Sequence, residues 1–351
     1  MPQLDQLAGQ LDRLATFDPG PFPVISLYLN LQADDRGRDR YGAFLKKTFP
    51  ERIRGYAPHA PERKSLDRDL ERIDRYLGDV PGSANGLALF ACAGADLFEA
   101  MALPAPIQEH QLFITNQPHL YPLARLIDEY PPYAVLVADT NTARIIVFAL
   151  NAVARTDYVD GPKTKRHKMG GWSQARYQRH TDNFHLHHAK EVVDHLARVV
   201  RQERINKVIL AGDDVIVPLL RSQLPKDVTD FIVDVVRLDV NASERDILEA
   251  SIAALREDDA TTDREHVDRL IAGYRGSGLG CVGVEAVRRA FDLGQVDELL
   301  ISARGEALGP AADELIARAR QTAANIRFIE EAALLEPFGG VGAILRFKAI
   351  P

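Results

Sequence analysis

The chain has 351 residues, of which 46% are hydrophobic and 26% are charged. This is ordinary globular usage, which excludes collagen-like, low-complexity and largely disordered proteins, and the length predicts two or three domains. With 43 Lys and Arg against 50 Asp and Glu, the net charge is -7, which excludes a protein that coats nucleic acid with a global positive field. Any contact with nucleic acid must therefore come from a local basic segment.

The cysteines and the lengths of the hydrophobic runs indicate in which cellular compartment the protein is expected. Cys92 and Cys281 form no Cys-x-x-Cys pair, so neither a disulfide framework nor a thiolate zinc site is supported. Residues 1–17 have the pattern of an amphipathic helix rather than of a signal peptide. No apolar run approaches the roughly 20 residues that a membrane-spanning helix needs. We expect a soluble, cytoplasmic protein with no membrane partner.

Residues 1–130 are expected to form an N-terminal α+β domain, because strand-like and helical patterns are mixed and a Pro131–Pro132 pair follows as a natural boundary. In chain order the expected elements are a helix over 1–17, a strand over 22–30, a helical segment over 36–77, a strand-like segment over 82–100 and a loop-rich segment over 104–122.

Residues 131–259 are expected to form a middle domain, since a hairpin over 133–150 is followed by alternating helices and strands, which predicts a mixed sheet covered by helices. Asp139 is expected to cap the hairpin turn, Asp213 and Asp214 to begin a helix, and Ser243 to cap another. The remaining elements are a Gly- and Lys-rich loop over 161–171, helices over 173–203, 214–223 and 243–256, and strands over 207–212 and 231–236.

Residues 260–351 are expected to form a C-terminal α/β/α sandwich of ordinary domain size. A helix over 262–274 is broken by the glycines of 275–280. The other expected elements are helices over 284–291 and 311–322 and strands over 296–302, 325–329 and 342–347.

A basic segment, GPKTKRHKMGGWSQARYQRH over residues 161–180, carries the strongest functional signal. It contains six Lys and Arg and no Asp or Glu. Cations that neutralise phosphates release counterions, and unpaired bases stack on aromatic rings, so this composition suits RNA. Trp172 and Tyr177 supply the aromatic rings of this segment. The candidate RNA-binding residues are Lys163, Lys165, Arg166, Lys168, Arg176, Tyr177 and Arg179.

Two glycines in this segment, Gly170 and Gly171, permit positive φ and a close approach of the backbone to a ligand. Ser173 is a candidate helix cap, which would place Gln174 in the first turn, near free N–H groups and the positive end of the helix dipole. A neutral amide in that place orients a water or an oxyanion without a titrating base. From the residues alone, a solvated basic loop with turn glycines is an equally good interpretation.

Residues 165–179, KRHKMGGWSQARYQR, resemble the Gly-Gly-Gln loop and the succeeding helix of archaeo-eukaryotic class I release factors. Residues 280–300 and 337–347, GCVGVEAVRRAFDLGQVDELL and PFGGVGAILRF, look like the C-terminal domain of those factors and of Pelota. The resemblance spans about residues 131–351 and is to the bacterial archaeo-eukaryotic release factor families, family 10 in particular.

This resemblance implies an α/β multidomain fold whose RNase-H-like middle domain carries the Gly-Gly loop and whose C-terminal domain is an α/β/α sandwich. It implies that the loop enters the peptidyl transferase centre of the ribosome, at the CCA end of a tRNA and beside rRNA. The candidate catalytic residues are then Gly170, Gly171, Trp172 and Gln174. By the same resemblance the C-terminal domain is where a translational GTPase would dock, and no cofactor is implied.

The segment departs from the family at the residue after the two glycines, which is Gln in the family and Trp172 here. The arrangement Gly171-Trp-Ser-Gln174 resembles the Gly-x-x-Gln loop of eukaryotic ribosome-quality-control factors. The first domain has no stop-codon-reading Asn-Ile-Lys-Ser motif. The leading interpretation is therefore codon-independent ribosome rescue, by ester hydrolysis or by cleavage of the tRNA 3′ end. The alternative is a non-catalytic hibernation or stress factor at the same site, so enzymatic activity stays open.

Three further patterns carry weaker functional signals. Five histidines between His180 and His195 lack acidic or cysteine partners at a recognised metal spacing, so we expect no metal and take the histidines as solvated or RNA-facing. The segment from Arg275 to Gly280 follows a helix and lacks Gly-x-Gly-x-x-Gly spacing, so it is not a dinucleotide loop. A second small basic patch, Arg36 to Arg40, is more typical of a solvated loop than of an RNA contact.

Overall fold

The computed structural model describes residues 2–33, 41–80, 84–160, 174–304 and 308–348. The chain divides into two compact units, one of residues 131–261 and one that combines residues 1–130 with 262–351. The boundary at 261 falls within a long helix, α8, Glu244–Ala272. Among the described residues, no helix is both long and apolar enough to cross a membrane.

The unit of residues 131–261 is built on one five-stranded mixed sheet in the order β7-β6-β5-β8-β9. Strands β5, β8 and β9 are parallel, whereas β6 and β7 run antiparallel to their neighbours. Its elements are β5 Tyr133–Ala138, β6 Thr142–Ala149, β7 Ala152–Asp160, α5 Gln174–Gln202, β8 Val208–Gly212, α6 Ile216–Gln223, α7 Lys226–Thr229, β9 Ile232–Val236 and the first part of α8.

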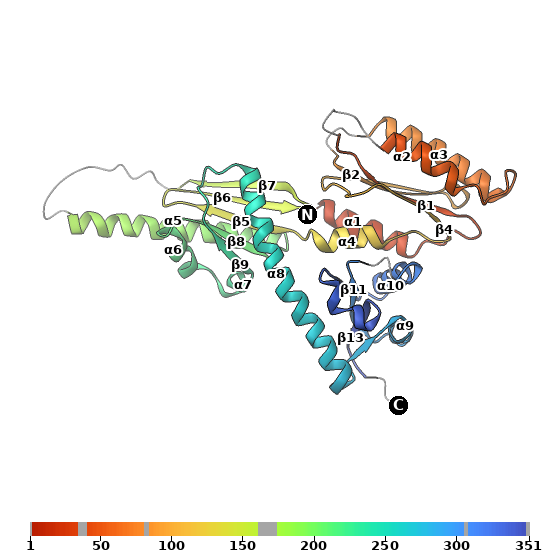
Figure 1. Ribbon diagram of the computed structural model, residues 1–351. Helices are drawn as coiled ribbons and strands as arrows, with labels where there is room; N and C mark the ends of the chain where they lie inside the picture. Colours follow the sequence, from red (N-terminus) through yellow and green to blue (C-terminus); the bar gives the residue numbers. More distant parts are fainter. Residues whose placement is uncertain (1, 34–40, 81–83, 161–173, 305–307, 349–351) are drawn as a thin grey trace. The chain divides into compact units, whose positions relative to one another are not determined.

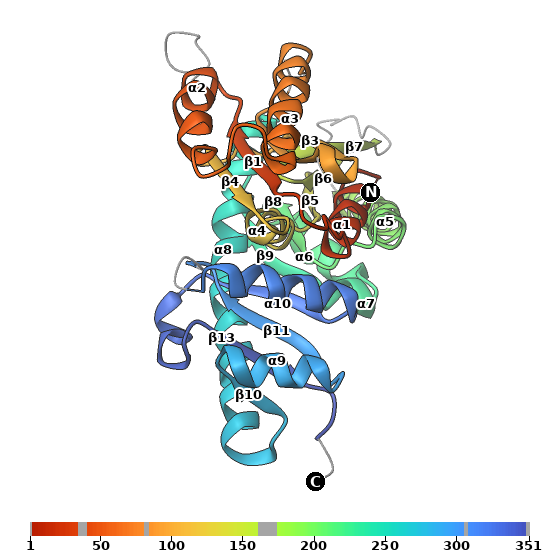
Figure 2. The ribbon, with the colours of Figure 1, turned by 90° about the vertical axis from the view of Figure 1, so that its right-hand side faces the viewer.

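Helices cover both faces of this sheet, and Figure 2 shows strands β5, β6 and β8 between α5 and α8. One face buries Val135, Val137 and Ile209 against Ile247 and other residues of α8. Successive strand residues point to opposite faces, so the alternate residues face α5 and α6. The five strands are buried on both sides wherever the sequence is a continuous apolar run, as in β5 and β8. The α/β fold expected for this region is confirmed.

Several local expectations for this unit are confirmed and two are wrong. Asp139 Oδ1 accepts the N–H groups of Asn141 and Thr142 at 2.7 Å each, which closes the hairpin turn as expected. Ser243 Oγ accepts the Asp246 N–H and is the expected cap. Residues 152–160, for which the sequence predicts no element, form the edge strand β7. The two helices expected over 243–256 and 262–274 are one helix, α8, because no Gly or Pro separates them.

The unit of residues 1–130 and 262–351 contains two sheets. The first is antiparallel, in the order β3-β2-β1-β4. Its elements are α1 Pro2–Ala15, β1 Val24–Asn30, α2 Tyr41–Arg52, α3 Pro61–Gly78, β2 Gly86–Cys92, β3 Leu97–Leu103, β4 Gln111–Thr115 and α4 Tyr121–Glu129. The segment over 104–122, expected as loop-rich, holds β4, whose short run of five residues pairs along β1.

The second sheet of this unit has the order β10-β13-β11-β12. The end of α8 covers one face, through Val267 and Leu270 against Leu300. Helices α9 and α10 contact the strands of the same sheet and bury Val287 and Leu315. These are the three layers of the expected α/β/α sandwich. The elements are β10 Gly280–Val282, α9 Val284–Asp292, β11 Val296–Ser302, α10 Pro310–Gln321, β12 Asn325–Ile329 and β13 Val341–Leu345.

The two sheets of this unit are joined by α1 and α4, which lie between the first sheet and α10 (Figures 1 and 2). The carboxylate of Asp313 in α10 accepts the N–H groups of Leu120 and Tyr121 at 2.8 and 3.0 Å and contacts His119 Nδ1 at 2.6 Å. An acidic group at the start of α4 also faces the positive end of its helix dipole. The segments expected as the first and third domains therefore belong to one compact unit.

Candidate functional site

The predicted glycine loop is bracketed by two described elements. Strand β7 ends at Asp160, and helix α5 begins at Gln174. Gln174, Arg176, Tyr177 and Arg179 belong to the first turns of α5 by their backbone. The other predicted residues, Lys163, Lys165, Arg166, Lys168, Gly170, Gly171 and Trp172, lie outside the described residues. Their roles stay predictions, and the geometry available is that of the two stems of the loop.

The end of β7 is tied to the far end of α5 by an ion-pair network, whose partners are His195 in the last third of α5 and Glu203 directly after its last residue. The guanidinium of Arg155 donates to both carboxylate oxygens of Asp157, at 3.0 and 2.7 Å, and to Glu203 at 3.1 Å. His195 Nε2 lies 2.8 Å from Asp157 Oδ2. A two-pronged Arg–carboxylate contact has fixed geometry. Because β7 is an edge strand with one strand neighbour, these contacts tie it to α5 where backbone pairing cannot.

The charges of this network stabilise one another. Burial acts to raise the pKa of Asp157, but the hydrogen bonds from Arg155 and His195 outweigh it and hold the pKa below its ordinary value. The carboxylate is therefore ionised throughout the physiological range and keeps accepting from both partners. A carboxylate with an imidazole on one side and a guanidinium on the other fixes the ring of His195 in one orientation.

A groove with a volume of about 590 Å³ opens beside this network. Its lining is Tyr158, Val159, Asp160, His187, Lys190, Glu191, Asp194, His195 and Arg198. Lys190 and Arg198 form no ion pair with the described residues, and 68% of the Tyr158 surface is exposed. The lining therefore combines two cations with three acids, Asp160, Glu191 and Asp194, and one exposed aromatic ring beside the end of β7. The described residues contain no group of His, Cys, Asp and Glu that could hold a metal ion.

The histidines of α5 are not all solvated or RNA-facing, so that expectation is wrong for one of them. His188 is only 2% exposed, and neither ring nitrogen has a hydrogen-bond partner among the described residues. Burial lowers the pKa of His188, and the backbone of Thr142 and the carboxylate of Asp139 offset part of that shift. His188 is therefore a neutral core residue of α5, and His195, seven residues on, has an acidic partner that spacing did not reveal.

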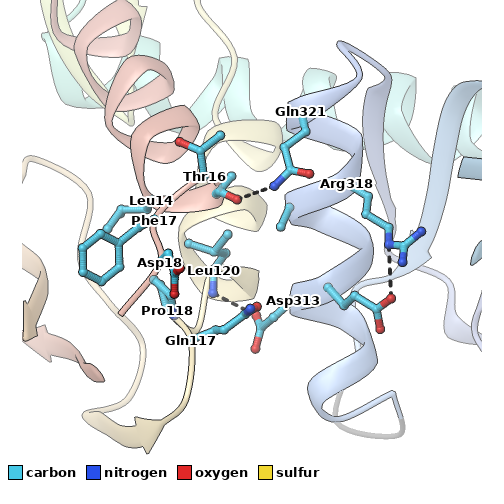
Figure 3. Close-up of a pocket in the computed structure, with 13 residues that line it drawn as sticks. Leu14, Thr16, Phe17, Asp18, Gln117, Pro118, Leu120, Asp313, Arg318 and Gln321 are labelled. Carbon is cyan, nitrogen blue, oxygen red and sulfur yellow. Dashed lines mark hydrogen bonds and ion pairs between the residues drawn. The ribbon is translucent and has the colours of Figure 1, made fainter. Parts of the chain in front are cut away.

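A second cavity, with a volume of about 310 Å³, lies between α1, the segment before α4, and α10 (Figure 3). Several of its polar side chains already have hydrogen-bond or ion-pair partners within the protein. Asp313 accepts from Leu120, Gln321 Nε2 donates to the carbonyl of Ala15 at 2.7 Å, and Arg318 contacts Glu314 at 3.2 Å. This cavity is a seam between two sheets rather than a ligand site.

Sequence reasoning missed the Arg155–Asp157 contact because it assigned no element to residues 152–160. Part of the signal was present, since Arg155, Asp157 and Val159 are spaced two residues apart and share one face of β7, whereas a register shift at Ala154 places Val153 on the other face. A charged pair on the face of a strand that also carries a buried valine indicates an ion pair with a covering element. The partner Glu203, 48 residues along the chain from Arg155, has no sequence signal.

Comparison with known proteins gives three kinds of likeness. The family described as "Bacterial archaeo-eukaryotic release factor family 10" matches residues 118–256. "Peptide chain release factor subunit 1" of Aeropyrum pernix is 24% identical over 314 residues, which are 82% of this chain and 80% of the relative. Among solved structures, Dom34 of S. cerevisiae has 11% identity and a TM-score of 0.46, with 70% of this chain and 75% of that chain covered. Pelota of Archaeoglobus fulgidus has 16% identity and a TM-score of 0.37, with 76% and 80% covered.

Proposed function

We propose that the chain belongs to a release-factor-like family of translation factors and is a cytoplasmic ribosome-rescue factor that acts on peptidyl-tRNA at the peptidyl transferase centre. In this proposal the loop before α5 reaches the CCA end of the tRNA without reading a codon. The partners are rRNA and tRNA, with a translational GTPase at the C-terminal domain. Dom34 of S. cerevisiae interacts with Hbs1, whereas for this chain the GTPase rests on the sequence resemblance of the C-terminal domain.

The observation that carries the proposal is the acid-free basic segment over 161–180, which falls inside the region matched by the family. The chain has a net charge of -7, so six cations without an acid in 20 residues are a local exception. A segment of this kind gains affinity for RNA from counterion release. The position of Gln174 at the first residue of α5 adds support, since the N–H groups of a first helical turn have no partner within the helix.

The chemistry we assign to the loop is hydrolysis of the ester between peptide and tRNA. Gln174 orients a water through its neutral amide, and N–H groups at the start of α5 stabilise the oxyanion. The water oxygen forms a bond to the ester carbonyl carbon and the bond to the ribose oxygen breaks, so the peptide leaves as an acid and the tRNA keeps its hydroxyl. Gly170 and Gly171 let the backbone approach the CCA end. Cleavage of the tRNA 3′ end is the other course open to the same loop.

A second candidate function is favoured by Trp172, which stands where the resembling family has its Gln. An indole ring stacks on a base but has no acceptor for a water hydrogen. In this alternative the loop occupies the same site without reacting, and the protein is a hibernation or stress factor that protects the centre.

The test is ribosome pelleting combined with release of peptide from peptidyl-tRNA on stalled ribosomes. Three proteins are compared: the natural chain, Gly170→Ala/Gly171→Ala, and Gln174→Ala. The matched control is Gly9→Ala/Gly78→Ala, because at both of these glycines an added Cβ meets open space. Release lost in both loop variants but kept in the control supports the rescue enzyme. Pelleting without release supports the protective factor, and absence of pelleting overturns both.

A further inference from the structure

The second helix of the chain carries a group of exposed cations that the proposed loop function does not use. Lys46 and Lys47 lie in α2, Arg52 is its last residue, and Arg54 follows in the next turn. All four are exposed, and we call them the α2 basic surface. Residues 41–60 contain a single acid, Glu51.

The cations of the α2 basic surface are uncommitted, since none of the four forms an ion pair or side-chain hydrogen bond in the described part of the chain. The neighbouring helix α3 differs in its acids: its exposed Lys64, Arg68 and Arg75 likewise form no ion pair among the described residues, but the helix also carries five Asp and Glu. There Arg63 pairs with Asp67 at 3.0 Å, and the Arg72 guanidinium lies 4.7 Å from the centre of the Phe98 ring. In a chain with more acids than bases, four cations with a single acid among them, Glu51, create a positive field that extends into solvent.

The fold directs this surface outward. Leu45 and Phe49 are buried against the face of the first sheet that carries Leu27 and Leu29. The opposite face of the sheet carries Tyr28, whose hydroxyl donates to the carbonyl of His119, and that face meets α1 and α4. The α2 basic surface therefore lies on the side of the first sheet away from α10.

We propose that the α2 basic surface binds the phosphate backbone of RNA. From Lys46 to Arg54 the cations span about 12 Å at helical rise, which is several phosphates of one strand. An acidic protein partner would be held by buried aromatic or aliphatic anchors. Among the described residues, no large exposed hydrophobic side chain lies in 41–60, whereas Tyr158 and Tyr274 elsewhere are more than half exposed. Backbone contacts to phosphates need charge and no such anchor.

The experiment measures the salt dependence of RNA binding by the full chain. The probe is a fluorescent single-stranded 20-nucleotide oligo(U), titrated at several KCl concentrations. The test variant is Lys46→Gln/Lys47→Gln/Arg54→Gln. The matched control is Lys64→Gln/Arg68→Gln/Arg75→Gln, which removes the same charge from exposed positions of α3, where acids alternate with the cations. Both variants keep the basic segment over 161–180, so that segment contributes equally to both measurements.

We expect the slope of log affinity against log salt to fall by about 2 in the α2 variant, which is three phosphate contacts at ~0.7 each, and by less than about 0.5 in the α3 variant. Circular dichroism that matches the natural chain shows that both variants fold. Equal falls in the two variants overturn the proposal, because they reflect total charge alone. An unchanged slope in the α2 variant overturns it, as does a loss of binding to labelled poly-glutamate with RNA binding retained. None of these outcomes depends on peptide release by the loop.

Discussion

A buried acid in α3 gives a quantitative test of the first sheet. Asp69 is 0% exposed, its Oδ2 accepts the Ala93 N–H at 3.0 Å, and its Oδ1 has no partner among the described residues. Burial raises the pKa of Asp69 to about 6, against 3.8 for an ordinary Asp, although the Ala93 N–H and the nearby Arg72 act in the other direction. The perturbation we propose is Asp69→Asn, because an amide oxygen still accepts from Ala93 and the side chain no longer ionises.

The sign of the effect follows from proton linkage. The folded state holds the proton of Asp69 up to about pH 6, whereas the unfolded chain releases it near pH 3.8. Stability is therefore lost as the pH rises through this window and stays low above it. A shift of about 2 pKa units corresponds to roughly 3 kcal/mol at 1.36 kcal/mol per unit. The free energy of unfolding of Asp69→Asn, minus that of the natural chain, should thus rise by about 3 kcal/mol between pH 3.5 and pH 7.

The assay is urea unfolding at several pH values in this window, with two probes. Circular dichroism follows the whole chain. The reaction of Cys92 with a disulfide reagent that works in acid follows the first sheet, because this thiol is 0% exposed and lies in β2 next to Asp69. A Cys281→Ser background removes the other thiol. The matched control is Asp74→Asn, an exposed acid in the same helix, whose difference from the natural chain should stay within about 0.5 kcal/mol at every pH.

The reasoning is refuted if the Asp69→Asn difference is flat with pH or falls as the pH rises. A flat difference would mean that Asp69 ionises in the folded state as an exposed acid does. An equal rise in Asp74→Asn would mean that the net charge of the chain, and not the buried position, causes the effect.

Three further outcomes are expected. His188→Leu should reduce the loss of stability of residues 131–261 as the pH falls below about 6.5, because the unfolded chain takes up a proton that the buried ring refuses; urea unfolding at pH 5 and pH 8 measures this. Asp313→Ala should cost about 1–3 kcal/mol in thermal unfolding, since two N–H groups at the start of α4 lose their acceptor, and Arg320→Ala, which breaks an ion pair with Asp12, should cost under about 1 kcal/mol. Asp157→Ala should destabilise the chain by about 1–3 kcal/mol, because it leaves Arg155 and His195 without their shared acceptor, and hydrogen exchange of the β7 amides should rise with it.

The fold was predictable wherever one local rule decided an element. The hairpin of β5 and β6 was predictable from two β-branched runs around Thr140–Thr142, and the start of α8 from Ser243. The middle of α8 was not, because charged residues around Asp258 look like a linker in sequence. In the structure two of these acids bind the ammonium of Lys207, at 2.9 and 2.5 Å, and the helix continues. A charge run satisfied by a distant partner has no local signature.

The two missed strands, β4 and β7, share a physical reason. Both are edge strands of their sheets; β4 has only five residues, and the nine residues of β7 mix apolar and polar side chains. An edge strand pairs with one neighbouring strand, whereas a central strand such as β1 pairs with two. The sequence of an edge strand therefore carries a weaker β-strand pattern. The Arg155–Asp157 contact was invisible for the same reason, as it depends on β7 being recognised as a strand.

The candidate site could be located in the sequence only by its cluster of cations and its two glycines. The structure adds a second criterion, which is whether each cation has an ion-pair partner in the folded chain. In the C-terminal sandwich, Arg288 and Arg318 are paired with Glu314 and Asp292, at 2.6 and 2.5 Å. Such cations are numerous in the sequence but are neutralised within the fold. The cations of α2 have no such partner among the described residues. A count of Lys and Arg therefore overstates the positive charge that the C-terminal sandwich offers to a ligand and understates that of α2. For a chain with net charge -7, the number of cations left uncommitted after folding, rather than the pI, decides where a polyanion is held.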